Sequence, residues 1–194
     1  QWRTGMTDYY FSLAGMNLNQ ETAGYVKTED CPSGQEAYED ETCAKSNPFP
    51  EAYRDAQAFR SFLRMERSLS DGATLTVTPY LRTNDMEFLM HFLPGQAVEE
   101  NEHTSIGAQI SYARNSDRVS YVVGLDSELT NGELTEIQTQ AATPFFHTFN
   151  YLVGTHYDYE VDATTFAPYV HAVWHLSEKT DLTTGLRAEY TEYD

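Results

Sequence analysis

The sequence predicts an all-β protein, an antiparallel up-and-down sheet of about seven strands that forms a segment of a transmembrane β-barrel. Three observations lead to this prediction. Apolar and polar side chains alternate with a period of two between turn signals, while an apolar 3.6-residue period of useful length is almost absent. Short and long connections alternate strictly along the chain. The polar faces of the predicted strands carry charged side chains that suit a water-filled lumen.

The first three predicted strands cover residues 1–17, 52–68 and 74–83. The first places Tyr9, Phe11 and Leu13 on one face. The second and third carry apolar faces made of Phe59, Leu63 and Met65, and of Leu75, Val77 and Leu81. The third follows a turn with the sequence LSDG.

The last four predicted strands cover residues 104–114, 119–129, 161–175 and 182–193. The alternation is clearest in the first of these, where the apolar face is Ile106, Ala108, Ile110 and Tyr112. The other apolar faces are Val119, Tyr121, Val123 and Leu125, then Val170, Ala172 and Trp174, then Leu182, Leu186, Ala188 and Tyr190. Since a proline cannot donate to a β-ladder, Pro79 and Pro168 each mark a bulge, a strand end or an error of assignment.

The connections predict how the strands are laid out. Those at about 69–72, 115–117 and 176–181 are short, and those at about 18–51, 84–103 and 130–160 are long. In an up-and-down sheet this alternation places every tight turn at one end and every long loop at the other. Outer-membrane barrels have this layout, with short periplasmic turns and long extracellular loops.

Charge and composition exclude some classes of function. The net charge of −18 and a pI near 4.5 argue against nucleic acid as a partner, because phosphate binding needs clustered Lys and Arg. The 14 Tyr, 10 Phe and 2 Trp argue against disorder. No run approaches the roughly 18 apolar residues of a spanning helix. The chain is therefore soluble, or it meets a membrane through strands.

The polar faces and the aromatic side chains favour the membrane barrel. Six charged residues are predicted to be luminal: Arg60, Arg64, Arg82, Arg187, Glu66 and Glu189. Tyr112, Tyr121 and Trp174 lie next to short turns, where one interfacial girdle would run, and Tyr190 lies at the expected height of the other. A β-sandwich core would also explain these aromatics, and cross-strand ion pairs would also explain the charges.

The two cysteines, Cys31 and Cys43, are predicted to close a small surface loop as a disulfide, which suits an oxidising compartment. Two unrelated thiols are the alternative. No further Cys or nearby His completes a zinc site. The acids around the cysteines lack the spacing of a calcium loop: Glu29, Asp30, Glu36, Glu39, Asp40 and Glu41. Neither a metal nor another cofactor is expected.

The chain ends at Asp194 within an apparent strand, and seven strands cannot close a bacterial barrel. We therefore expect residues 1–194 to be a partial barrel domain, an internal piece of a longer polypeptide that lacks the closing strands.

Two stretches resemble barrel strands of TonB-dependent outer-membrane receptors: AYRDAQAFRSFLRMERSLSDGATLTVTPYLRTNDMEFLMHFLPGQ and FAPYVHAVWHLSEKTDLTTGLRAEYTEYD. In the second, a Gly-Leu-Arg-x-Glu-Tyr pattern is supplied by Gly185, Leu186, Arg187, Glu189 and Tyr190. The resemblance implies energised uptake of a scarce nutrient, most commonly a ferric siderophore, across the outer membrane of a Gram-negative bacterium. It also implies outer-membrane lipid as a partner, a TonB complex acting through a plug domain absent from this chain, and no bound cofactor.

Two aromatic-rich loops are the candidate binding sites for the small-molecule ligand, for example a ferric chelate. The candidate residues are Met86, Phe88, Met90, His91 and Phe92 in one loop, and Phe146, His147, Phe149 and Tyr151 in the other. Packing within the loop layer is the alternative for both, and Met86 to Phe92 can also continue the third strand. Enzyme activity is not expected, because no nucleophile, base and orienting residue are evidently placed together. A secreted or periplasmic β-sandwich binding module and a passive porin remain alternative functions.

Overall fold

The structure is a computed structural model that describes residues 1–27, 31, 39–142 and 151–194 of the chain. It is one antiparallel sheet in which β1 (Trp2–Thr4), β2 (Thr7–Glu21), β3 (Tyr53–Ser68), β4 (Ala73–Leu89), β5 (Val98–Arg114), β6 (Val119–Gln138), β7 (Gly154–Ser177) and β8 (Thr180–Arg187) are neighbours in chain order. A ninth strand, β9 (Tyr190–Tyr193), also pairs with β7. The predicted all-β, up-and-down architecture is confirmed.

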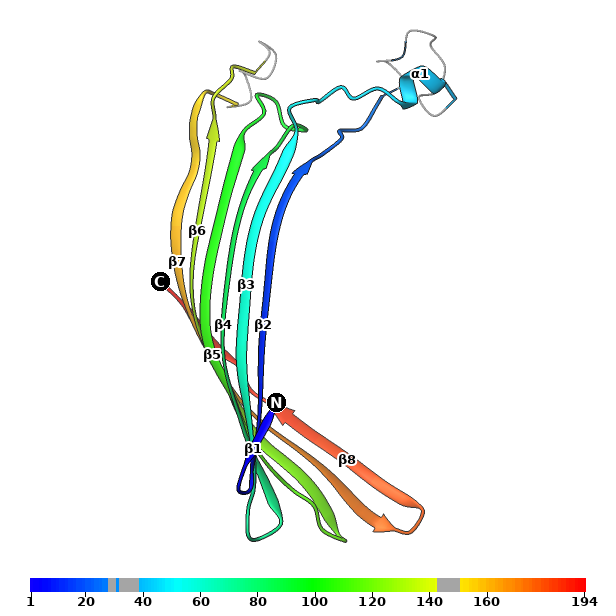
Figure 1. The fold of residues 1–194 in the computed structure, drawn as a ribbon, viewed down its shortest axis with the longest axis vertical. Coiled ribbons are helices and arrows are strands. Elements are labelled where there is room, and N and C mark those ends of the chain that lie inside the picture. Colours follow the sequence, from blue (N-terminus) through cyan, green and yellow to red (C-terminus); the bar gives the residue numbers. More distant parts are fainter. Residues whose placement is uncertain (28–30, 32–38, 143–150) are drawn as a thin grey trace.

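The connections lie as the sequence predicts (Figure 1). The long ones after β2, β4 and β6 gather at the upper end of the sheet, and the tight turns lie at the lower end. The helix α1 (Glu41–Ala44) lies in the first long connection, where the side chain of Asp40 accepts hydrogen bonds from the backbone N–H groups of Thr42 and Cys43. No helix in the described ranges is long and apolar enough to cross a membrane.

The strands are longer than predicted, and this corrects several boundaries. The predicted loop at 84–103 shrinks to 90–97, because β4 continues to Leu89 and β5 begins at Val98. Likewise β6 continues to Gln138, and β7 begins at Gly154. The residues beyond the predicted ends still pair across strands, but polar side chains replace the apolar ones on one face, so the sequence there resembles a loop.

The first and last predicted strands are each split in two. The first bends back at Gly5, whose φ of 60° is readily adopted only by glycine, and this turn separates β1 from β2. The last is interrupted opposite Pro168. Here β8 pairs with β7 up to Tyr169 and β9 pairs with it from Phe166, so the break falls at the residue that has no N–H to donate.

Pro79 also marks an irregularity, as expected. The pairing of β4 with β3 runs to Tyr80 opposite Phe62 and resumes in the same register at Val77 opposite Met65, so the pairing is interrupted around the proline. On its other side Pro79 lies opposite Ala108 of β5. The sheet therefore accommodates both prolines by giving up local pairing on one side of the strand.

Two tyrosine rings lie on glycines of the neighbouring strand. A β-carbon added to Gly107 would lie 2.4 Å from the ring of Tyr80 and 2.7 Å from the carbonyl oxygen of Ser127. The ring of Tyr169 covers Gly124 in the same way, at 2.3 Å. These glycines leave room for aromatic rings that pack flat on the sheet.

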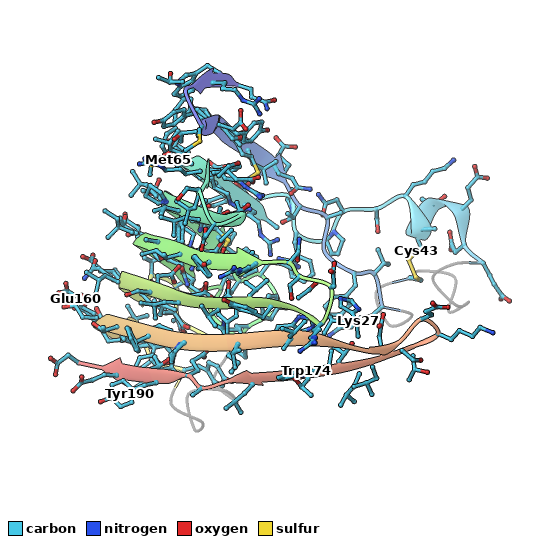
Figure 2. The ribbon with its side chains drawn as sticks, turned by 90° about the horizontal axis from the view of Figure 1, so that it is seen from below. Lys27, Cys43, Met65, Glu160, Trp174 and Tyr190 are labelled. Atoms are coloured by element: carbon cyan, nitrogen blue, oxygen red, sulfur yellow. A yellow bond between two sulfur atoms is a disulfide. The ribbon has the colours of Figure 1, made fainter. Side chains whose placement is uncertain are left out.

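The predicted disulfide is confirmed, since Cys31 and Cys43 are bonded and both are buried. Cys43 belongs to α1, so the bond ties the helix to the earlier part of the same connection. Figure 2 shows Cys43 well away from the strands. The disulfide therefore stabilises the connection rather than the sheet.

Replacing Gly107 by alanine is expected to destabilise the fold by about 1–3 kcal/mol, because the new methyl group overlaps both Tyr80 and a backbone oxygen. The matched control is Gly132→Ala, where the nearest atom would lie at an ordinary 3.7 Å. Thermal unfolding should separate the two variants. Equal melting temperatures would contradict the proposed packing.

Reduction of the disulfide is expected to speed tryptic cleavage after Lys45, which follows α1, while the strand signal in circular dichroism stays unchanged. The double variant Cys31→Ser/Cys43→Ser should behave like the reduced protein. A loss of strand signal on reduction would show that the bond also supports the sheet.

Candidate functional site

The register assigns every strand residue to one of two faces. The apolar face carries large exposed side chains, among them Leu186 at 71%, Ile106 at 59% and Leu13 at 59% exposed. Its other members include Phe11, Val77, Leu81, Ile110, Val123, Leu125, Leu129, Phe166, Val170 and Leu182. The described strands form a single sheet with no second layer over this face, unlike a β-sandwich.

Aromatic residues with polar groups border the apolar face near the tight turns. The rings of Tyr112 and Tyr121 are 6.2 Å apart, and the Tyr112 hydroxyl donates to Asp71 at 2.8 Å. The Trp174 indole N–H donates to Thr184 at 3.1 Å. Tyr190 lies at the other end of the apolar stretch of β7 (Figure 2). It pairs with Phe166, which is eight residues from Trp174 along β7.

The same face becomes acidic beyond the apolar stretch, towards the long connections. Asp85, Glu102, Glu133 and Glu160 occupy successive cross-strand positions in one row. The neighbouring positions add Asp55, Glu87, Glu100, Asp158 and Asp162. We call this set the acidic zone. It places nine of the chain's 30 acidic residues at one end of one face.

Like charges in the acidic zone change local ionisation. The carboxylate of Asp85, assisted by burial and by Glu133, raises the pKa of Glu102 above its ordinary value. Burial and a hydrogen bond to Glu87 raise the pKa of Tyr53 to about 12. Tyr53 is therefore a neutral donor to Glu87 at physiological pH, while the Glu102 carboxylate is held beside other negative charges at an energetic cost.

The opposite, polar face carries the charged residues predicted to be luminal. Arg60, Arg64, Glu66, Arg82 and Arg187 share it, and Glu189 contacts it from the break between β8 and β9. A cavity of about 600 Å³ opens on this face, lined in part by Arg64, Gln109, Asp126, Tyr169, His171 and Arg187.

The arginines of the polar face are mostly paired. Arg82 and Tyr80 both donate to Glu128 at 2.6 Å, and Arg187 donates to Asp126 at 2.5 Å. Arg187 also contacts Glu189 at 3.2 Å, and Arg64 contacts Glu66 at 2.8 Å. The pairs to Glu128 and Asp126 each span an intervening strand, β5 and β7 respectively, whereas Arg64 and Glu66 belong to the same strand. Arg60 lies directly opposite Arg82, so two like charges adjoin there.

The polar face in turn becomes apolar near the long connections. Met16, Leu18, Ala56, Met86 and Phe88 form one strip, and Leu134, Tyr157, Tyr159 and Val161 form another. Tyr157 is 55% and Tyr159 50% exposed. The polarity of the two faces is thus exchanged between the lower and upper halves of the sheet.

An aromatic cluster lies at the upper end, between the first and second long connections. The ring of Phe49 is 4.9 Å from that of His91 and 6.3 Å from that of Tyr25. Phe92 is 5.6 Å from His91 and 6.0 Å from Phe88. We refer to these five rings as the aromatic cluster.

Two cations lie over the aromatic cluster. The Arg54 guanidinium is 4.8 Å from the centre of Phe88, and the Lys27 ammonium is 5.5 Å from that of Tyr25. The arrangement combines aromatic surface with positive charge. Sequence reasoning missed Tyr25, Phe49 and Arg54, although the first two lie in the first long connection that it did identify.

The structure places the candidate ligand residues in different parts of the fold. Met86 and Phe88 are in β4, so their assignment to a loop was wrong, and they continue the third predicted strand. Met90 is buried, while His91 and Phe92 lie in the connection after β4. Tyr151 is half-buried after β6. Phe146, His147 and Phe149 lie outside the described residues.

Ser120, His175 and Asp181 come together at the lower end of the polar face. The Ser120 hydroxyl is 3.2 Å from Nε2 of His175, and Nδ1 of His175 is 2.9 Å from Asp181. This order matches a nucleophile, a base and an orienting carboxylate. However, the His175 and Asp181 side chains are 34% and 56% exposed, and the trio lies outside the large cavity. The three side chains connect β6, β7 and β8 through these polar contacts.

In the described part of the chain, no group of three or more His, Cys, Asp or Glu side chains is placed so that it could hold a metal ion.

Comparisons with known proteins find similarity at the level of structure. No family model matches the chain, and neither does any curated protein. Among solved structures, the chain is similar to the ferric-catecholate import receptor Fiu from E. coli K12 in its closed form, with a TM-score of 0.53 and 12% sequence identity. The match covers 97% of this chain and 32% of the receptor, so the chain spans about a third of that protein's length. At this identity the similarity shows that the two proteins share a β fold.

Proposed function

We propose that this chain forms part of the barrel wall of an outer-membrane receptor that takes up a small nutrient, with an aromatic ferric chelate as the best chemical match. One observation carries the proposal, namely that an exposed apolar face on a single sheet ends at aromatic residues on one side and at the acidic zone on the other. A soluble protein would rarely leave so large an apolar surface uncovered.

The height of the apolar face supports a bilayer as its environment. On β6, the apolar face runs from Val119 to Leu129, ten residue steps apart. A strand tilted by about 40° rises roughly 2.5 Å per residue, so this stretch is about 25 Å tall, the height of the apolar band of outer-membrane barrels. On β5, the apolar residues from Ile106 to Tyr112 pair with the part of this stretch from Leu129 to Val123.

The acidic zone sets the orientation. Placing a carboxylate in the hydrocarbon core costs up to about 3 kcal/mol, and here many carboxylates share one face. The upper end of the sheet must therefore lie in water. Because outer-membrane barrels carry their long loops outside the cell, this end is extracellular, and the turns near Asp71 and Ser116 face the periplasm.

The ligand proposal depends on the extracellular end. The aromatic cluster, with Arg54 and Lys27 above it, provides stacking surface and positive charge for an anionic aryl compound. The structurally similar receptor is named for the import of ferric catecholates, and catecholates are anionic aryl compounds. Energised transport would further require a plug domain and a TonB complex.

The lipid assignment predicts opposite effects for two lysine substitutions on the same strand. Ile110→Lys is expected to destabilise the protein by about 2–4 kcal/mol, since it places a charge near the middle of the apolar face. Glu102→Lys should be neutral or stabilising, because it relieves the repulsion around Asp85. Urea unfolding in lipid vesicles measures both. Full stability of Ile110→Lys, or recovery of the protein in the soluble fraction, would overturn the membrane assignment.

The ligand assignment predicts that Phe92→Ala weakens binding of a ferric dihydroxybenzoate complex about tenfold, the loss expected for one aromatic contact. Phe166→Ala, which removes an exposed ring from the apolar face, is the control and should bind normally. Quenching of intrinsic fluorescence gives both dissociation constants. Equal affinities would exclude the aromatic cluster as the site and leave the membrane assignment intact.

A further inference from the structure

His156 occupies an irregular position at the start of β7. The register shifts here, since Glu136 pairs with Tyr157 while Ile137 pairs with Thr155, so His156 is the extra residue of a bulge. Its Nδ1 is 2.8 Å from a carboxylate oxygen of Glu136, and its Nε2 is 2.7 Å from the carbonyl oxygen of Leu152. Both ring nitrogens therefore face an oxygen acceptor.

This geometry selects one protonation state. A neutral imidazole has a single N–H and would turn a lone pair towards one of the two oxygens, whereas the imidazolium donates to both. If the proton moved from the imidazolium to Glu136, both groups would be neutral and the ion pair would be lost. The pair is largely buried, since the side chains of Glu136 and His156 are 9% and 20% exposed. The carbonyl of Leu152, and then Glu136, raise the pKa of His156 above its ordinary value.

Among the residues that the structure describes, the charged and titratable groups next to this pair in the register are acidic or phenolic. Glu99 of β5 lies directly opposite Glu136, and Tyr157 is the register partner of Glu136 on β7. Asp158 follows on the other face of β7. These neighbours favour the positive charge on His156.

A second, non-titrating contact holds the same segment. The Gln138 amide is almost fully buried and donates to the carbonyl oxygens of Gln140 at 2.7 Å and Tyr151 at 3.1 Å. Gln138 also packs against Gly95 of the connection after β4, where an added β-carbon would lie 2.1 Å from its nitrogen. Gln138 thus holds Tyr151, and His156 holds Leu152. Of these two anchoring side chains, only His156 can change its charge.

We propose that His156 is a pH-sensitive anchor that, in its protonated form, fastens the segment Tyr151–Val153 to the end of β6 through Glu136 and releases it on deprotonation. The anchor does not depend on the identity of any ligand or on the membrane assignment.

The direction of the effect follows from the raised pKa. The anchor contributes fully below the ordinary histidine pKa of about 6.5, and its contribution is lost as the pH rises through the higher pKa of the folded state. Acidic media therefore keep the segment fixed, and alkaline media loosen it. Gln138 limits the movement to the part of the segment that His156 holds.

The test is a spin label at Val153, a side chain that is 56% exposed and can accept one. In the full-length protein, Val153→Cys carrying the label should give a broad electron paramagnetic resonance spectrum at pH 6. The spectrum should narrow in a one-proton transition with a midpoint above 6.5. Glu136→Gln should move the midpoint to lower pH, and His156→Gln should abolish the transition. A label at Ser116 in a tight turn is the control and should not respond to pH.

Two outcomes would overturn the anchor. In the first, the spectrum of the label at position 153 is the same at pH 6 in the parent protein and in His156→Gln. The other is a pH response that persists unchanged in His156→Gln. If His156→Gln does not fold, Glu136→Gln decides, because an unshifted midpoint in that variant contradicts the role assigned to the ion pair.

Discussion

The structure depends on the antiparallel register that runs from β2 to β8, with shifts at Glu136/Ile137 and at His175/Ser177. Because side chains alternate across a sheet, this register decides which residues reach each face, and a slip by one residue would exchange the faces. Between β5 and β6 the pairing is unbroken from Val98 opposite Ile137 to Arg114 opposite Tyr121. The tyrosine rings seated on glycines of the next strand help to specify it, since a β-carbon at either glycine would overlap the ring.

The exchange of polarity along the sheet accounts for the unusual charge of the chain. The net charge of −18 is not spread evenly, because the acidic zone gathers carboxylates on one face while Arg64, Arg82 and Arg187 are matched by acids on the other. Few cations are left to neutralise the acidic zone. Such a surface is stable only where water solvates it, which is consistent with an end of the sheet that projects from a membrane.

The part of the fold predicted from the sequence is the part with a constant pattern. Residues 104–114 and 119–129 were identified because one face stays apolar throughout, and both ranges lie within β5 and β6. The extensions Val98–His103 and Thr130–Gln138 were missed because acids there take the positions that apolar residues hold lower down. The turn at Gly5 was missed because a single glycine among alternating residues does not distinguish a turn from a strand.

The candidate site was only partly predictable for a different reason. His91 and Phe92 were identified from one aromatic-rich segment, but Phe49 joins them from a connection more than 40 residues earlier, and no local pattern reveals that contact. The same holds for His156 and Glu136, which are 20 residues apart and meet only because β6 and β7 pair with a bulge. Contacts of this kind follow from topology, not from spacing.

The seating of Tyr80 on Gly107 also has an evolutionary consequence. The ring occupies the volume that any larger residue at position 107 would need, so position 107 cannot change freely while Tyr80 is present. Related chains that retain Tyr80 should therefore retain Gly107, and such a pair would identify which two strands are neighbours in proteins known only from their genes.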